Sequence, residues 1–147
     1  MEIMEQVTAD MKAALKNREK IRLGALRMLL AESKNRRIEL QRELAEDDIL
    51  QLISRMVKQR QEAAEQFAAG GRDELADKEK AEVEVLKAYL PASLTEAELE
   101  ALVRAAIAEA GAESKKDMGK VMKIVMPKVA GRADGKLVNQ MVSRLLA

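Results

Sequence analysis

Apolar residues recur three and four residues apart along almost the whole chain, which is the spacing of one side of an α-helix. No stretch shows the sustained alternation of apolar and polar residues that is typical of a β-strand. The sequence therefore predicts an all-α protein. The helices are expected over residues 2–16, 18–42, 46–69, 73–90, 95–110 and 117–129, and from residue 134 to the end.

A break in this pattern at Pro91–Leu94 divides the predicted helices into two groups. Proline disfavours helical geometry in the residue before it, so the preceding helix must end there. A strong helix start follows, since Thr95 and Glu98 have the spacing of a capping box and Leu94 and Leu99 that of a hydrophobic staple. We therefore expect an N-terminal four-helix lobe, residues 1–91, and a C-terminal three-helix lobe, residues 92–147.

Glycine and short polar residues predict the ends of the individual helices. Gly70-Gly71, Gly111 and Gly131 can adopt the left-handed conformation that terminates a helix. Asn17, Asp73 and Asp134 can accept hydrogen bonds from the first free amides of the helices that follow them.

Two predicted helices contain residues that local helix preferences disfavour, so packing against other helices must explain them. The segment from Ile21 to Leu30 is apolar around most of its circumference, which predicts a helix surrounded by others. Gly24 within it costs ~1 kcal/mol relative to alanine, so we expect another helix to approach closely there. Pro127 lies inside the helix predicted over residues 117–129, where it removes one backbone hydrogen bond. A kink is expected rather than a break, because Val129 continues the apolar stripe.

Composition narrows the chemistry that is available. Hydrophobic residues make up 48% of the chain and aromatic residues 1%, so the core must be largely aliphatic. The chain has no cysteine and no histidine, which removes thiolate ligands, the commonest metal ligand and the commonest general base. No apolar run approaches the ~20 residues that span a bilayer, and the first residues are too polar for a secretory signal. A soluble, cytoplasmic protein without membrane contact is expected.

Charge is distributed unevenly although the net charge is only +1. Residues 71–113 have a balance of −6, residues 114–147 have a balance of +6, and a second basic stretch runs from Lys16 to Arg37. Such asymmetry indicates a polyanion-binding surface, a solvated face, or two lobes that attract one another. The basic residues of the C-terminal hairpin are Lys115, Lys116, Lys120, Lys123, Lys128, Arg132 and Lys136.

The predicted helix over residues 117–129 separates these charges from its apolar side. At 100° per residue, Lys116, Lys120 and Lys123 fall together, opposite an apolar stripe that includes Val121 and Val125. Phosphates favour clustered lysines, and helix N-termini after Ser114 and Asp134 would add backbone donors. The seven basic residues are therefore the candidate nucleic-acid-binding residues.

The same hairpin carries a family resemblance. The run MGKVM at 118–122, followed after eight residues by GRADGKLVN at 131–139, resembles the tail-domain signature shared by YqeY proteins and the B subunit of the bacterial aspartyl/glutamyl-tRNA amidotransferase. RLGALRML at 22–29, VKQRQ at 57–61, KEK at 78–80 and YLP at 89–91 resemble the YqeY family specifically. The resemblance implies an all-α protein in two parts. It also implies a link to tRNA, because the matching amidotransferase tail is an RNA-contacting module.

Three hypotheses about function follow from these observations. The first is an accessory module that binds tRNA or another structured RNA. The second is a protein-interaction adaptor without a nucleic-acid role. The third is a component of a tRNA-dependent amidotransferase that acts only in a complex. We expect no catalytic residue, metal site or cofactor in the chain alone, because the resemblance covers the amidotransferase tail and not its catalytic part.

Overall fold

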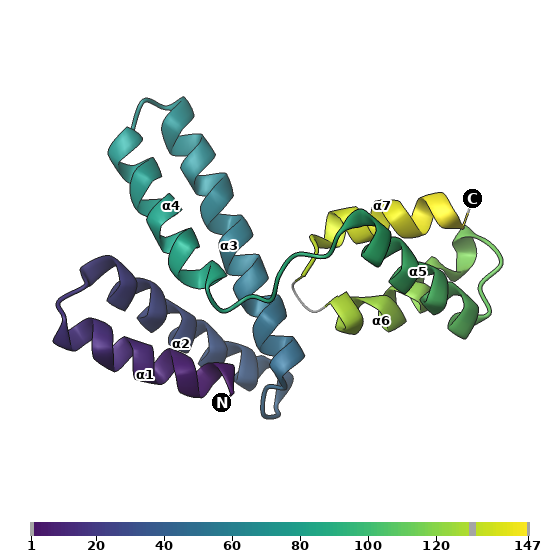
Figure 1. The fold of residues 1–147 in the computed structure, drawn as a ribbon, viewed down its shortest axis with the longest axis horizontal. Helices are drawn as coiled ribbons and strands as arrows, with labels where there is room; N and C mark the ends of the chain where they lie inside the picture. The colour runs from purple at the N-terminus through teal and green to yellow at the C-terminus, as the bar shows by residue number, and fades with distance from the viewer. Residues whose placement is uncertain (1, 130–131, 147) are drawn as a thin grey trace. The chain divides into compact units, whose positions relative to one another are not determined.

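The structure is a computed structural model that describes residues 2–129 and 132–146. Within these residues it is all-α, as the sequence predicts (Figure 1). The elements are α1 (Ile3–Lys16), α2 (Lys20–Leu40), α3 (Glu46–Ala69), α4 (Asp73–Lys87), α5 (Glu96–Ala110), the short 3-10 helix η1 (Lys115–Asp117), α6 (Met118–Val129) and α7 (Gly135–Leu145).

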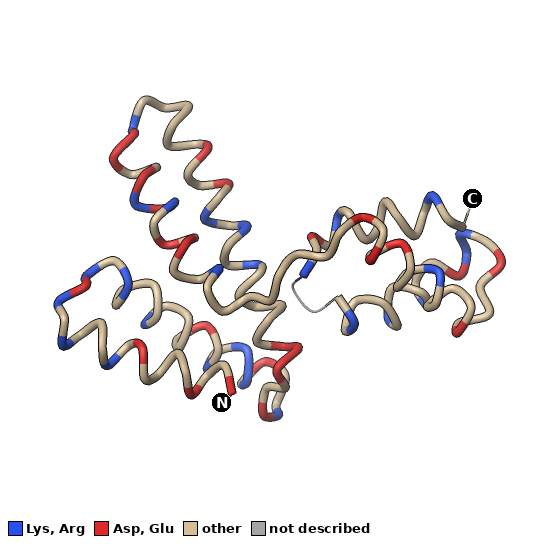
Figure 2. Tube along the Cα trace, viewed as in Figure 1, with Lys and Arg blue, Asp and Glu red and all other residues tan. Residues whose placement is uncertain are grey.

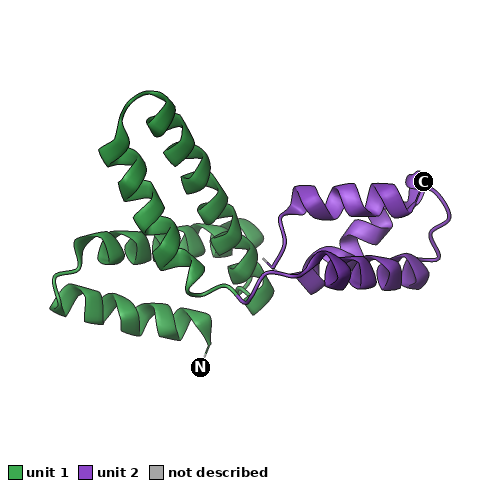
Figure 3. Ribbon diagram, turned by 45° about the horizontal axis from the view of Figure 1, so that its top comes forward, with its two compact units in different colours: residues 1–90 green, residues 91–147 purple. Residues whose placement is uncertain are grey.

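The chain divides into two compact units, residues 1–90 and residues 91–147 (Figure 3). This division is compatible with the two predicted lobes, since the predicted boundary lies one residue later, after residue 91. Unit 1 holds α1 to α4, and unit 2 holds α5, η1, α6 and α7. Each unit has its own hydrophobic core.

Unit 1 consists of two helical hairpins, α1 with α2 and α3 with α4 (Figure 1). Its core is aliphatic, as the composition predicts. An ion pair between Arg60 and Glu82 joins α3 to α4 at 3.0 Å, with both side chains largely shielded from solvent. The buried side chains of the main cluster are Val7, Leu26, Leu29, Ile49, Leu52, Ile53, Met56, Val57, Val83 and Leu86.

Two helix caps predicted in unit 1 were wrong. Asn17 ends α1, since its N–H donates to the Ala13 carbonyl at 2.9 Å, and so it does not cap the next helix. Arg18 then takes a φ of 59°, and this left-handed step delays α2 until Lys20. Asp73 is the first helical residue of α4 and not its cap, although its charge there still favours the helix dipole.

The environment of α2 differs from the prediction. Ile21 is 42% exposed and Met28 is 49% exposed, so the apolar half of this helix is not surrounded. A side chain at Gly24 would meet no atom within 4 Å, so no described helix approaches it closely. Both predictions were wrong because α2 contacts α1, α3 and α4 through one side only. The other side is exposed, and only at its Ile21 end does it border α4, where Ile21 lines a hollow with Ala81 and Val85.

The helix ends of unit 2 follow the sequence closely. The Thr95 hydroxyl accepts a hydrogen bond from the Glu98 amide at 3.1 Å, and the Glu98 carboxylate accepts one from the Thr95 amide at 3.3 Å. The predicted capping box is therefore confirmed. Gly111 ends α5 with a φ of 64°, also as predicted. Leu94 and Leu99 lie in the same apolar cluster, as the hydrophobic staple requires.

The second half of unit 2 is the hairpin of α6 and α7. Val121, Val125 and Val129 are buried on one side of α6. The helix continues through Pro127 to Val129, so it does not break there, whereas the expected kink stays a prediction. Asp134 caps α7 by accepting from the Lys136 amide at 3.1 Å. Gly131, the predicted end of the preceding helix, lies outside the described residues.

We propose that the two units are separate domains joined by the segment at residues 91–95. Limited proteolysis of the native chain is expected to cut first there or at Gly70-Gly71, because both places are mostly exposed and lie outside helices. Mass spectrometry of the early fragments checks this. A single resistant unit without early cleavage at either place would contradict the two-domain interpretation.

Candidate nucleic-acid interface

The predicted basic residues all lie in unit 2. Lys115 and Lys116 belong to η1, three lysines lie on α6, Arg132 precedes α7 and Lys136 lies in its first turn. Figure 2 shows basic positions along α6, whereas acidic and basic positions are mixed along α4. These residues are spread over 22 positions of the sequence and lie on η1, on α6 and at the start of α7.

The centre of this surface is a set of three side chains on η1 and α6, which we call the lysine face: Lys116, Lys120 and Lys123. All three are exposed, and none makes an ion pair within 4.0 Å with another described residue. Their orientation follows from the burial of Val121 and Val125 on the opposite side of α6. Because the core holds the apolar stripe, the ammonium groups must point into solvent.

Gly119 lies among these lysines and is exposed. A side chain there would meet no atom within 4 Å, so the packing of the described residues does not require glycine. Gly119 is the second residue of α6 and so lies in its first turn.

Two of the predicted residues already have partners inside unit 2. The Lys128 ammonium lies 3.1 Å from the Glu109 carboxylate of α5. The Arg132 guanidinium donates to the Ala92 carbonyl at 3.0 Å and lies 3.9 Å from Glu98. Arg132 therefore holds the segment that leads into α5, and a phosphate would have to compete with these contacts.

The amides at the two helix starts are also occupied. Lys116 donates its N–H to the Ser114 hydroxyl at 3.4 Å, and Lys136 donates its N–H to the Asp134 carboxylate at 3.1 Å. The expectation that these N-termini add free backbone donors was therefore wrong for these two amides. The side chains of Lys115 and Lys136 are exposed and form no ion pair within 4.0 Å of a described residue. Their charges add to the positive charge of unit 2.

A groove of about 580 Å³ lies between the start of α5 and α7. Leu99 and Met141 contribute apolar surface, and Leu137, which is 55% exposed, lies beside them. Its charged residues include the pair Arg144–Glu96, 3.8 Å apart. Sequence reasoning missed this groove, because it forms only when two helices about 40 residues apart meet. Its mixed charges do not extend the basic surface.

The basic stretch of unit 1 is partly neutralised by internal ion pairs. Arg22 lies 3.4 Å from Glu19 and 3.8 Å from Asp10. Arg36 pairs with Glu39 at 2.9 Å within α2. This second concentration of positive charge therefore offers fewer free cations than the sequence suggests.

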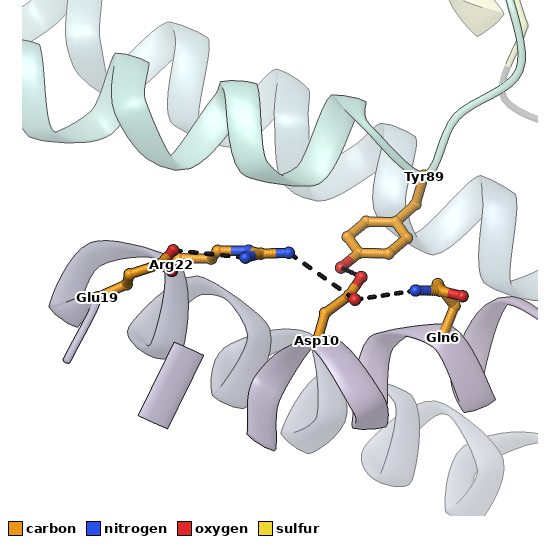
Figure 4. A network of polar contacts seen from close by, with 5 residues as sticks. All are labelled: Gln6, Asp10, Glu19, Arg22 and Tyr89. Carbon is orange, nitrogen blue, oxygen red and sulfur yellow. Dashed lines mark hydrogen bonds and ion pairs between the residues drawn. The ribbon is translucent and has the colours of Figure 1, made fainter. Parts of the chain in front are cut away.

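A polar cluster in unit 1 connects α1, α2 and the turn that follows α4 (Figure 4). The Tyr89 hydroxyl donates to the Asp10 carboxylate at 2.5 Å, and Gln6 donates to the same carboxylate at 2.9 Å. Burial, and then the hydrogen bond to Asp10, raise the pKa of the Tyr89 hydroxyl. A tyrosine that stays protonated is a poor base or nucleophile near neutral pH. We therefore interpret the cluster as a structural clamp.

Replacing Tyr89 by phenylalanine is expected to destabilise the protein by about 1 kcal/mol at pH 8, because the hydrogen bond to Asp10 is lost. The raised pKa means that the folded state favours the neutral hydroxyl. The stability that the neutral hydroxyl adds is complete below the ordinary tyrosine pKa of about 10. It is lost as the pH rises toward the raised pKa of Tyr89 in the folded protein. Urea unfolding of both proteins from pH 8 upward measures this. A difference that stays constant above pH 10 would contradict the clamp.

The part of the chain that the structure describes shows neither a metal-binding cluster of acidic residues nor a membrane-spanning helix. There, no group of three or more Asp or Glu residues is arranged to hold a metal ion. None of the helices in that part combines the length and apolar character that a membrane crossing requires.

The structure thus shows an all-helical chain whose C-terminal hairpin exposes lysines on one side. Comparison with known protein families shows which class of protein has these features. The family model described as "Yqey-like protein" matches residues 4–146. The chain belongs to this family, as the motifs indicated.

Its relatives include a yeast protein named altered inheritance of mitochondria protein 41, mitochondrial. The Saccharomyces cerevisiae protein is 29% identical over 91 residues, which cover 61% of this chain and 49% of the relative. The Lachancea thermotolerans protein is 33% identical over 82 residues, which cover 55% of this chain and 44% of the relative. The Candida glabrata protein is 32% identical over 83 residues, which cover 55% of this chain and 46% of the relative. The matched segments thus span about half the length of these relatives.

Proposed function

We propose that this chain is an accessory protein that binds tRNA, or another structured RNA, through the lysine face of unit 2. The observation that carries the proposal is the exposure of three lysines on one side of η1 and α6, none of which forms an ion pair with another described residue. Unpaired cations held on a rigid helix suit a phosphate backbone, because binding releases the counterions of the nucleic acid.

The composition supports recognition of backbone and shape rather than of bases. The only aromatic residues, Phe67 and Tyr89, both belong to unit 1, and Tyr89 is engaged with Asp10. Unit 2 therefore has no ring on which an unpaired base could stack. Lysine contacts to phosphate carry no sequence information directly, so similar affinity for different tRNAs is expected.

The family supports the link to tRNA through the resemblance of its C-terminal signature to the amidotransferase tail. The names of these relatives refer to mitochondria and to no substrate. The cytoplasmic location expected from the sequence stays a prediction for this chain. We expect no amide-forming activity from the chain alone, since the resemblance is confined to the tail.

Binding of fluorescently labelled tRNA at increasing salt tests the proposal. Three phosphate contacts are expected to produce a slope of roughly 2–3 in the fall of log affinity against log salt. Fluorescence anisotropy measures the affinity at each salt concentration. No binding at low salt, or an affinity that does not change with salt, would remove the RNA-binding function.

The second candidate, a protein-interaction adaptor, has support in the exposed apolar residues of unit 1. Ile21, Met28 and Ile38 on α2 are 42%, 49% and 65% exposed. A pull-down with and without RNase separates the two functions. Partners that disappear with RNase favour RNA binding, and partners that persist favour the adaptor.

A further inference from the structure

The outer side of α2 carries a repeating stripe that the packing of unit 1 leaves exposed, although Ile21 at one end lines a hollow with Ala81 and Val85 of α4. Its members alternate at spacings of three and four residues, which is the heptad spacing of a two-stranded coiled coil. All of them are exposed. The stripe, which we call the α2 seam, consists of Ile21, Gly24, Met28, Ala31, Asn35 and Ile38.

The seam lies opposite the side of α2 that holds the core. Ala25, Leu26 and Leu29 are buried on the inner side. The large side chains of the seam are therefore left in solvent by the packing of the unit itself. Gly24 and Ala31 also leave the helix backbone open, and nothing lies within 4 Å of a side chain placed at Gly24. A second helix could thus approach α2 closely along a length of roughly 27 Å.

The charges beside the seam are sorted by sign. Lys20, Arg27 and Lys34 follow one edge at heptad spacing, and none has an ion pair within 4.0 Å among the described residues. Glu32 and Glu39 follow the other edge, where Glu39 contacts only Arg36 of its own helix at 2.9 Å. One edge is therefore basic and the other acidic.

We propose that the α2 seam binds a second copy of this chain as a parallel, two-stranded helix pair. In parallel pairs, a residue on one edge faces the opposite edge of the partner five positions later. Arg27 would then face Glu32 of the second copy, and Lys34 would face its Glu39. An antiparallel pair would place the basic edges side by side. Asn35 supports the same arrangement, since asparagine at this kind of heptad position specifies a parallel pair in register.

The expected dimer is weak. Two of the inner positions hold Gly24 and Ala31, where leucine gives the best packing in such pairs. The seam is also short, and small interfaces are typical of transient association. Sedimentation velocity from low-micromolar to near-millimolar protein is expected to show a monomer–dimer equilibrium that shifts with concentration.

Substitutions in the seam test this assignment. Met28→Glu is expected to abolish dimerisation without lowering the melting temperature, because Met28 is already half exposed. Gly24→Leu with Ala31→Leu is expected to tighten the dimer at least about tenfold. Leu75→Glu on α4, where the leucine is 39% exposed, is the matched control and should change nothing. A chain that remains monomeric even with both leucines would overturn the proposal.

A charge exchange distinguishes a second copy from other occupants. The variant Lys20→Glu, Arg27→Glu, Lys34→Glu has two acidic edges, and the variant Glu32→Lys, Glu39→Lys has two basic edges. Each alone is expected to be monomeric, and an equal mixture is expected to form heterodimers. If the mixture stays monomeric, or if dimers of the unmodified chain disappear with RNase, the seam does not pair as proposed.

The alignment of the two copies can be tested with a single cysteine, because the chain has none of its own. Asn35→Cys is expected to form a disulfide-linked dimer on mild oxidation, since residue 35 meets its counterpart only in a parallel pair in register. Leu75→Cys is the control. Equal yields from both cysteines would contradict the alignment. The seam belongs to unit 1 and the lysine face to unit 2, so either proposal can fail without the other.

Discussion

Reversing the charge of the lysine face is expected to weaken tRNA binding by about a hundredfold or more near physiological salt. The variant carries Lys116→Glu, Lys120→Glu and Lys123→Glu together. It removes three attractive contacts with phosphates and adds three repulsive ones. Anisotropy titrations with labelled tRNA measure the loss, and several tRNAs are expected to lose affinity alike, since phosphate contacts are independent of sequence.

The fold of this variant is expected to survive. All three lysines are exposed, and substitutions at such positions change stability by about 0.5 kcal/mol or less. Glutamate near the start of α6 also suits the positive end of the helix dipole. Circular dichroism should therefore show the same helicity and nearly the same melting temperature.

The matched control reverses three exposed lysines of α4: Lys78, Lys80 and Lys87. The change in net charge is identical, but these positions belong to the acidic middle of the chain. A much smaller loss of affinity is expected. Equal losses from the two variants would mean that bulk charge, and not the lysine face, attracts RNA.

Replacing Leu86 by alanine is expected to lower the free energy of unfolding by about 3 kcal/mol, within the 2–5 kcal/mol typical of buried leucines. Leu86 is fully buried in the core of unit 1, where α4 packs against α2 and α3. The truncation removes apolar contacts and leaves a cavity that the surrounding helices fill only in part. Urea unfolding followed by circular dichroism measures the change.

Leu75 on the same helix provides the comparison, because it is 39% exposed. Leu75→Ala makes the same chemical change without opening an internal cavity, so a loss below about 1 kcal/mol is expected. Similar losses at both positions would show that Leu86 does not lie in the core that the structure describes.

The sequence by itself determined the features that depend on residues within one or two helical turns. The capping box of Thr95 and Glu98, the end of α5 at Gly111 and the opposition of the lysine face to Val121 and Val125 were all predicted correctly. Each follows from the periodicity of a single helix or from hydrogen bonds between residues at most four positions apart.

Only the tertiary structure decided which sides of the helices stay in solvent and which polar groups find distant partners. The pattern of α2 predicted burial all round, whereas one side remains uncovered, because periodicity does not count the helices available to pack on it. The sequence did not indicate that Arg132 donates a hydrogen bond to the carbonyl of Ala92, 40 residues away. Tyr89 and Asp10 meet across 79 residues. Such contacts depend on how the chain folds back on itself, and no local spacing encodes them.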